Sequence, residues 1–222
     1  MRRGAKLSAP TCPNCGAAIH FAWSQAVQTV CPYCKAVLIR DQMDLKRVGT
    51  VGEMPATSSP IQLGTTGAFH RRRFTVVGRV VYAYDRGSWN EWHVRFDDAG
   101  EADTSAWLSD ARGEYAFAVA TTGQETPPLD RLHPGANFAW AQRIYKLTSV
   151  TTAQYASAEG ELPFTTWDRR EATLAQLDAN DGHIATLDYR GQPPALLLGE
   201  WATFDGLELD RLREIDGWPR PE

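Results

Sequence analysis

Residues 74–84 read Phe74-Thr75-Val76-Val77-Gly78-Arg79-Val80-Val81-Tyr82-Ala83-Tyr84, and this run indicates the fold class more clearly than any other part of the chain. Valine, tyrosine and phenylalanine favour β-strands. Apolar side chains fall on both faces, so we expect a strand that is covered on both sides. Gly78 interrupts the run near its middle, which predicts a bend or a β-bulge there.

The following residues continue the same pattern. Residues 85–88 have the composition of a turn, and residues 89–96 then alternate. The alternation puts two sets of side chains on opposite faces of a strand: Trp92, Val94 and Phe96 on one, and Glu91, His93 and Arg95 on the other. Short strands and turn signals recur downstream. We therefore predict an all-β body over residues 61–222, an antiparallel meander or barrel-like structure joined by hairpins.

Two short segments of this body resemble each other in sequence. Gly67-Ala68-Phe69 resembles Gly135-Ala136-Asn137-Phe138, and a proline-containing segment lies between them at 121–132. This resemblance suggests the hypothesis that the body consists of two pseudo-repeated halves, residues 61–125 and 126–222. The alternative is that β-meanders resemble one another at this level of detail.

All four cysteines lie upstream of the body, in Cys12-Pro13-Asn14-Cys15 and Cys31-Pro32-Tyr33-Cys34. Two C-x-x-C pairs at this spacing are typical of a zinc ribbon, in which each pair forms a tight knuckle and supplies two thiolates. We predict that Cys12, Cys15, Cys31 and Cys34 hold a structural Zn²⁺ ion within residues 11–40. Iron, or redox chemistry of the thiols, is the alternative. A module of this size needs its metal to fold.

The residue after each second cysteine often needs a positive φ angle. Gly16 adopts such an angle without strain, whereas Lys35 in the second knuckle adopts it less comfortably.

The flanks of the ribbon are polar. Residues 1–10 have the composition of a basic leader, and residues 41–60 that of a glycine-, proline- and serine-rich linker. Residues 1–47 hold seven basic and two acidic side chains, against sixteen and twenty-five in the remainder. The sequence suggests no signal peptide and no membrane span. We expect a cytoplasmic protein, in which paired thiols bind metal rather than form disulfides.

Six segments stand out together: Ser59–Gly67, Val77–Arg79, Trp89–Trp92, Trp107–Leu108, Gly160–Pro163 and Thr186–Tyr189. With the ribbon, they resemble a bacterial domain family of unknown function that is frequently preceded by a C-P-x-C-G zinc ribbon. The resemblance implies an all-β fold and, through gene neighbourhood in such bacteria, a loose link to polyamine-synthesis and envelope-stress genes. It supplies no activity and no catalytic residues. Lys35 departs from the glycine expected after the second knuckle.

The function that we favour is a zinc-binding protein-interaction or scaffold module. Tryptophan dominates many interfaces, and sheet edges bind partner strands. The candidate interaction residues are Trp89, Glu91, Trp92 and Trp107. For each tryptophan the alternative is a place in the hydrophobic core.

Two other functions stay open. The basic N-terminal region, with Arg71-Arg72-Arg73, is compatible with nucleic-acid binding. An enzyme could use Glu91 and His93 as an acid–base pair, although a solvated sheet edge explains these two residues more simply. Histidines at 70, 93, 133 and 183 are scattered without ligand spacing, and no nucleotide-binding or serine-nucleophile motif occurs. We therefore favour a role without catalysis.

Overall fold

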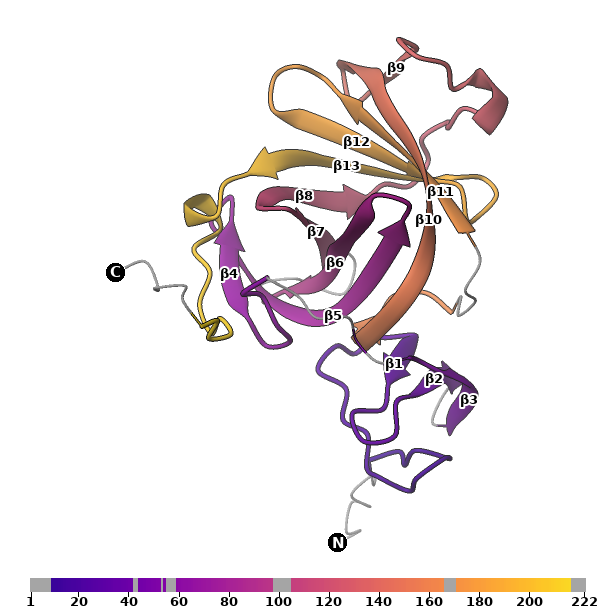
Figure 1. Ribbon diagram of the computed structural model, residues 1–222, viewed down its shortest axis with the longest axis vertical. Helices are drawn as coiled ribbons and strands as arrows, with labels where there is room; N and C mark the ends of the chain where they lie inside the picture. The colour runs from indigo at the N-terminus through magenta and orange to yellow at the C-terminus, as the bar shows by residue number, and fades with distance from the viewer. Residues whose placement is uncertain are drawn as a thin grey trace, which may run out of the picture.

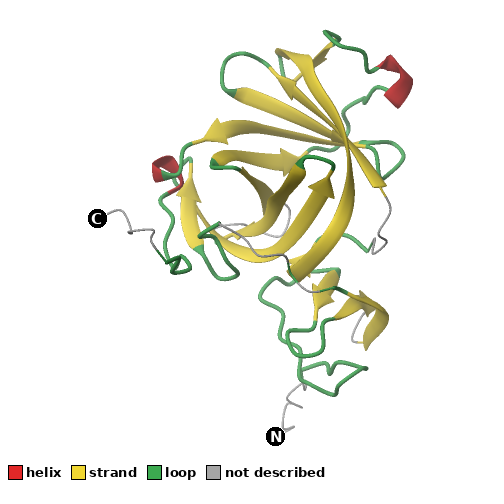
Figure 2. Cartoon of the chain, viewed as in Figure 1, coloured by secondary structure: helices red, strands yellow, loops and turns green. Residues whose placement is uncertain are grey.

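The computed structural model of the protein describes residues 9–41, 44–52, 54, 59–97, 105–165 and 171–216. Strands and their connecting turns make up nearly all of these residues, which confirms the predicted all-β class (Figures 1 and 2). The strands are β1 (Gln28–Val30), β2 (Ala36–Asp41), β3 (Asp44–Thr50), β4 (Thr66–Phe69), β5 (Arg72–Tyr84), β6 (Gly87–Phe96), β7 (Ser105–Ala111), β8 (Glu114–Ala120), β9 (Asn137–Trp140), β10 (Arg143–Leu162), β11 (Glu171–Asp178), β12 (His183–Asp188) and β13 (Ala195–Ala202). Two 3-10 turns, η1 (Leu129–Arg131) and η2 (Asp205–Leu207), are the described helices, and neither could span a membrane.

The body is a closed ring of antiparallel strands. Strands β5 to β8 form a meander, β8 pairs with β13, and β13, β12, β11 and β10 lead back. The ring closes because β10 also pairs with β5. The predicted barrel-like body is thus confirmed, and closure pairs each strand of the ring itself, β5 to β8 and β10 to β13, on both sides.

The two parts of the body have the same strand arrangement. Each begins with a four-residue strand, β4 or β9, which pairs with a long strand, β5 or β10. Both hairpins turn through two residues of positive φ: His70 (48°) and Arg71 (64°) in one, Ala141 (47°) and Gln142 (62°) in the other. This is the turn that favours tight hairpins. One such hairpin lies in each of the predicted halves, residues 61–125 and 126–222, and both the division into halves and a duplication stay predictions.

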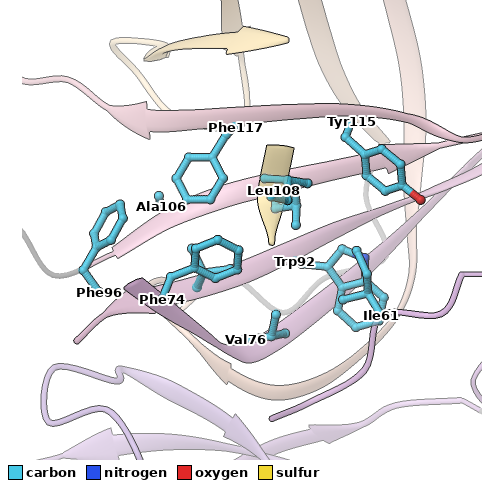
Figure 3. Packing of buried hydrophobic residues seen from close by; sticks show 11 residues of the cluster. Ile61, Phe74, Val76, Trp92, Phe96, Ala106, Leu108, Tyr115 and Phe117 are labelled. Carbon is cyan, nitrogen blue, oxygen red and sulfur yellow. The ribbon is translucent and has the colours of Figure 1, made fainter. Parts of the chain in front are cut away.

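The first half curls around an aromatic core (Figure 3). Phe74 of β5 and Phe117 of β8 have ring centroids 5.3 Å apart, although β6 and β7 lie between their strands. In a flat sheet three strand spacings would separate them by about 14 Å. The sheet is therefore strongly bent, with Trp92, Leu108 and Val94 on its concave side. The C-terminal segment lies along β4, where Thr66 bridges to Asp210 (Figure 1).

Strands β5 and β10 cross very closely where the ring closes. The register of β5 shifts between Val76 and Gly78, which confirms the bulge predicted at this glycine. Gly78 faces Gly160 of β10. A Cβ atom built on Gly78 would lie 2.1 Å from the Glu161 carbonyl oxygen, so only glycine fits.

The ribbon is not an independent module connected to the body only through a linker. Strand β1 pairs with β2 on one side and with β10 on the other, so the small sheet of the ribbon continues the sheet of the body (Figure 1). Residues 44–50 had the composition of a linker, but they form β3, which pairs with β2. That part of the 41–60 linker prediction was wrong, because cross-strand pairing outweighed the local composition. Residues 42–43, 53 and 55–58 of the linker, and 1–8 of the leader, lie outside the described residues.

Candidate metal centre and interaction surface

The two cysteine knuckles have the same backbone geometry. In each, the carbonyl of the first cysteine accepts a hydrogen bond from the amide four residues later: Gly16 to Cys12 at 2.8 Å and Lys35 to Cys31 at 3.1 Å. The φ angle is 76° at Gly16 and 60° at Lys35. The expected positive φ is therefore present in both knuckles, and Lys35 adopts it without the freedom of glycine.

The four sulfur atoms are arranged as metal ligands. All lie within 4.8 Å of one another, with Cys12 and Cys34 at 3.7 Å and Cys15 and Cys31 at 3.8 Å. A disulfide would require about 2.05 Å. A tetrahedron with metal–sulfur bonds of about 2.3 Å has edges of about 3.8 Å. The sequence-predicted ligands thus come together in a geometry that fits a four-coordinate metal ion.

The pKa values of two of these thiols also bear on metal binding. A hydrogen bond from the Asn14 side chain, helped by the Ala36 amide, lowers the pKa of Cys34 to about 6. The Ala17 amide lowers the pKa of Cys15, but burial and hydrogen bonds with the other three thiols raise it to about 12. The negative charge on one thiolate therefore opposes the ionisation of the next, and a bound metal cation would offset these negative charges.

A buried carboxylate joins the ribbon to the body. Glu161 of β10 accepts hydrogen bonds from the backbone amides of Ala22 (2.6 Å) and Trp23 (2.8 Å). Burial raises the pKa of Glu161, and these two hydrogen bonds partly counter that effect. The Trp23 ring meets His93 of β6 edge-on at 4.7 Å. The loop between the knuckles is therefore fixed to the wall of the body.

His93 is enclosed at this joint. Its side chain is 0% exposed, its Nδ1 donates to the Glu161 carbonyl at 2.8 Å, and its ring lies 5.1 Å from that of Trp107. Burial lowers the pKa of His93 to about 4. Glu91 and His93 share a strand face as predicted, but the solvated-edge interpretation was wrong for His93. The proposed acid–base pair therefore lacks an accessible base.

The four predicted interaction residues divide between two faces. Trp92 is 0% exposed and packs in the core, so its assignment to a contact surface was wrong. Trp89 and Glu91 lie on the opposite face of β6 and are partly exposed. The Trp89 indole donates to Glu91 at 2.9 Å, and the Ser109 hydroxyl donates to the same carboxylate at 2.8 Å. Strand alternation explains this division.

Trp107 completes the partly exposed face. It neighbours His93 across the β6–β7 pair, as Ser109 neighbours Glu91. Its ring stacks on Phe164 with centroids 6.1 Å apart. We call Trp89, Glu91 and Trp107 the tryptophan face. Burial raises the pKa of Glu91 to about 7, although hydrogen bonds from Ser109 and Trp89 lower it.

One cluster escaped the sequence analysis. His70 and His183, which appeared scattered, both contact the Glu200 carboxylate, at 3.0 and 3.2 Å. These residues are far apart along the chain, and no local spacing reveals them. The pairing of β12 with β13 puts His183 opposite Glu200, and the turn between β4 and β5 carries His70 to the same carboxylate.

Comparison with known proteins gives a family match. A family model described as a domain of unknown function (DUF4178) matches residues 62–206. This range begins after the ribbon and includes every strand from β4 to β13. No curated protein and no solved structure matches the chain.

Proposed function

This chain belongs to the DUF4178 family of domains of unknown function, so its family indicates no role. From the sites of this chain itself, we propose that it is a zinc-dependent scaffold whose tryptophan face binds a protein partner. Four thiolates select zinc or iron. The sulfur separations of 3.7 and 3.8 Å fit the edge of a tetrahedron whose zinc–sulfur bonds are about 2.3 Å long. With all four positions taken by cysteine, the ion would be structural, and its chemistry would be to hold the two knuckles together.

The single observation that carries the interaction proposal is the ordering of the tryptophan face. Trp89 is tied to Glu91 by a hydrogen bond of 2.9 Å, and Trp107 is stacked on Phe164. Aromatic side chains that are already fixed lose little conformational entropy on binding. Partly exposed tryptophan is also the residue type most enriched at energetic hot spots of interfaces.

The ribbon would support this face from one side. Trp23 and Trp107 both contact the ring of His93. Loss of zinc would release the loop that carries Trp23, and the packing behind Trp107 would loosen. Partner binding is therefore expected to depend on the metal, although the metal lies outside the contact surface.

Affinity capture with tryptophan variants tests the proposal. Tagged wild type, Trp89→Ala and Trp107→Ala would be crosslinked in lysate of the source organism, and the captured proteins identified by mass spectrometry. Trp201→Ala is the matched control, because Trp201 is 47% exposed on β13, outside the tryptophan face. We expect one protein whose recovery falls at least tenfold with both test variants and is unchanged with the control. Equal recovery by all four proteins would overturn the proposal.

Nucleic-acid binding stays a second candidate, on the basis of two exposed cations on β3. Lys46 and Arg47 project from the outer edge of the ribbon sheet. Arg40 is already engaged, since it donates to the Ser24 carbonyl at 2.7 Å and lies over the Phe21 ring. A salt-dependent mobility shift that Lys46→Glu abolishes is the test of this candidate.

A further inference from the structure

One arginine from outside the tryptophan face reaches into it. Arg190 lies just after the end of β12, and its Cζ atom is 5.5 Å from the ring centroid of Tyr82 and 5.1 Å from that of Phe164. Tyr82 stacks on Trp89 with centroids 5.2 Å apart, and Phe164 stacks on Trp107 with centroids 6.1 Å apart. The guanidinium therefore lies in the middle of a series of ring contacts that ends at the two tryptophans.

Two carboxylates accompany this guanidinium. Arg190 Nε is 2.9 and 2.8 Å from the two carboxylate oxygens of Asp188, and Arg190 Nη2 donates to Asp188 as well. The second carboxylate is Glu91. Burial is the main influence on the pKa of Glu91 and raises it, and the positive charge of Arg190 is among the influences that lower it. One cation thus lies near two acidic groups, so negative charge is in excess when all of them are ionised.

Aromatic rings combined with carboxylates are the surroundings in which proteins bind cations. The face of an aromatic ring attracts a cation, tryptophan most strongly, and the attraction grows where water is excluded. A guanidinium stacks on such rings and also pairs with a carboxylate through two parallel hydrogen bonds. Arg190 makes both kinds of contact, with Tyr82 and Phe164 on its faces and Asp188 at its edge. The place that it occupies is therefore suited to a guanidinium from any source.

This place is open to solvent. The side chain of Arg190 is 27% exposed, compared with 11% for Asp188. Trp89, Glu91 and Trp107 are partly exposed as well. The turn that carries Arg190 continues through exposed residues at 191–193. The arginine side chain therefore has a path into solvent, and a second cation has a path to the rings.

We propose that the tryptophan face recognises an arginine of the partner, and that Arg190 occupies the place of this arginine in the free protein. The inference rests on the proposed interaction function and identifies the partner surface as a basic segment. An incoming arginine would stack on the rings beside Glu91 and Asp188, while Arg190 turns into solvent. The excess of carboxylates selects a cationic side chain over a neutral or acidic one. Arg190 thus competes with the partner and lowers its affinity.

Titration of the zinc-loaded full chain with N-acetyl-arginine amide tests the site. Binding would be followed through the indole ¹H–¹⁵N signals of Trp89 and Trp107. Arg190→Ala removes the internal competitor and is expected to tighten binding at least tenfold relative to wild type. N-acetyl-citrulline amide, which has nearly the same shape without the positive charge, should bind neither protein. Arg143→Ala is the matched control, because Arg143 pairs with Asp181 outside this cluster and its loss should leave the affinity unchanged.

Two further measurements separate recognition from a change in the fold. In wild type, saturation with the arginine compound should release Arg190, whose Nε–H signal would lose the ring-current shift caused by Tyr82 and Phe164. Glu91→Gln added to Arg190→Ala is expected to weaken binding at least tenfold relative to Arg190→Ala alone.

Two outcomes would overturn the proposal: no gain in affinity from Arg190→Ala, or equal binding of the arginine and citrulline compounds. Arg190 would then be a structural link between β12 and the tryptophan face. The capture experiment is independent of this result, because a partner lost from Trp89→Ala and Trp107→Ala need not present an arginine.

Discussion

Lys35 bears a conformational cost that Gly16, its counterpart in the other knuckle, avoids. Its φ of 60° is in the left-handed region, where a side chain costs roughly 1–2 kcal/mol. We predict that Lys35→Gly stabilises the zinc-loaded protein by about 1 kcal/mol relative to Lys35→Ala. Denaturant unfolding measures the difference.

The comparison with alanine isolates the backbone effect, because both substitutions remove the same cation from beside the thiols. Gly16→Ala serves as the reverse control. No atom lies within 4 Å of a Cβ built on Gly16, so its cost would come from φ alone. Equal stability of the two Lys35 variants would contradict the prediction.

Residue roles were predictable where they depended on near neighbours in the chain. The spacing of Cys12 and Cys15 predicted a pair of metal ligands because both lie on one turn, and their sulfur atoms do come together with those of the second pair. The W-N-E-W run was ambiguous, since alternation separates Trp89 from Trp92 but does not say which face is buried. Glu200 carried no local signal at all, because its partners belong to other strands.

At the scale of elements, the crossing of β5 and β10 determines whether the ring closes. A Cβ on Gly78 would lie 2.1 Å from the Glu161 carbonyl oxygen, which is backbone and cannot rotate away. We predict that Gly78→Ala destabilises the protein by about 3 kcal/mol, near the upper end of overpacking effects. Thermal or denaturant unfolding measures the loss.

Gly52→Ala is the matched control for this prediction. No atom lies within 4 Å of a Cβ built on Gly52, and its φ is not in the left-handed region. A change below about 0.5 kcal/mol is expected there. Similar losses for the two variants would show that the close crossing is not what requires glycine.

The sequence indicated a bulge at Gly78, because a glycine in the middle of a valine-rich strand usually marks a bulge or a close approach of another backbone. It did not indicate that β10 is the strand that approaches there, since Gly160 lies far away in the chain. The same limit explains β3. Residues 44–50 have a weak strand signal and depend on pairing with β2, which composition does not report.

At the scale of the molecule, the ribbon and the body are stabilised by different means. The aromatic core around Phe74 and Phe117 contains no ribbon residue, whereas a second cluster mixes Val30 and Val37 with residues of β5 and β10. With zinc as the proposed ion of the cysteine site, we predict that its removal by a chelator unfolds the ribbon and leaves the ring intact. Hydrogen exchange should rise over residues 11–50 and near Leu162, but not in β12.

Restoring zinc should restore protection, which distinguishes metal loss from damage by the chelator. Serine substitution of Cys12 and Cys31 should reproduce the chelated pattern without any reagent. Unchanged protection of the ribbon in the chelated protein, or loss of protection throughout β12, would contradict the separation of the two modules.

The class of the fold and its hairpins were predictable from periodicity, because alternation and turn residues are local signals within each pair of strands. The closure of β10 on β5 and the docking of β1 on β10 were not. Both contacts depend on the global path of the sheet. Matching the DUF4178 family adds no partner or activity to this picture.

The docking of β1 on β10 has a consequence for biosynthesis. Gln28 pairs with Leu162, a residue synthesised 134 positions later (162 − 28). The cysteine knuckles therefore leave the ribosome long before β10, the strand on which the ribbon docks, has been synthesised. Until then Val30 and Val37 have no cover from the body, and exposed apolar surface on a nascent chain promotes aggregation. Binding of the proposed metal ion by the four cysteines during synthesis would keep the nascent ribbon folded while the rest of the polypeptide is still being made.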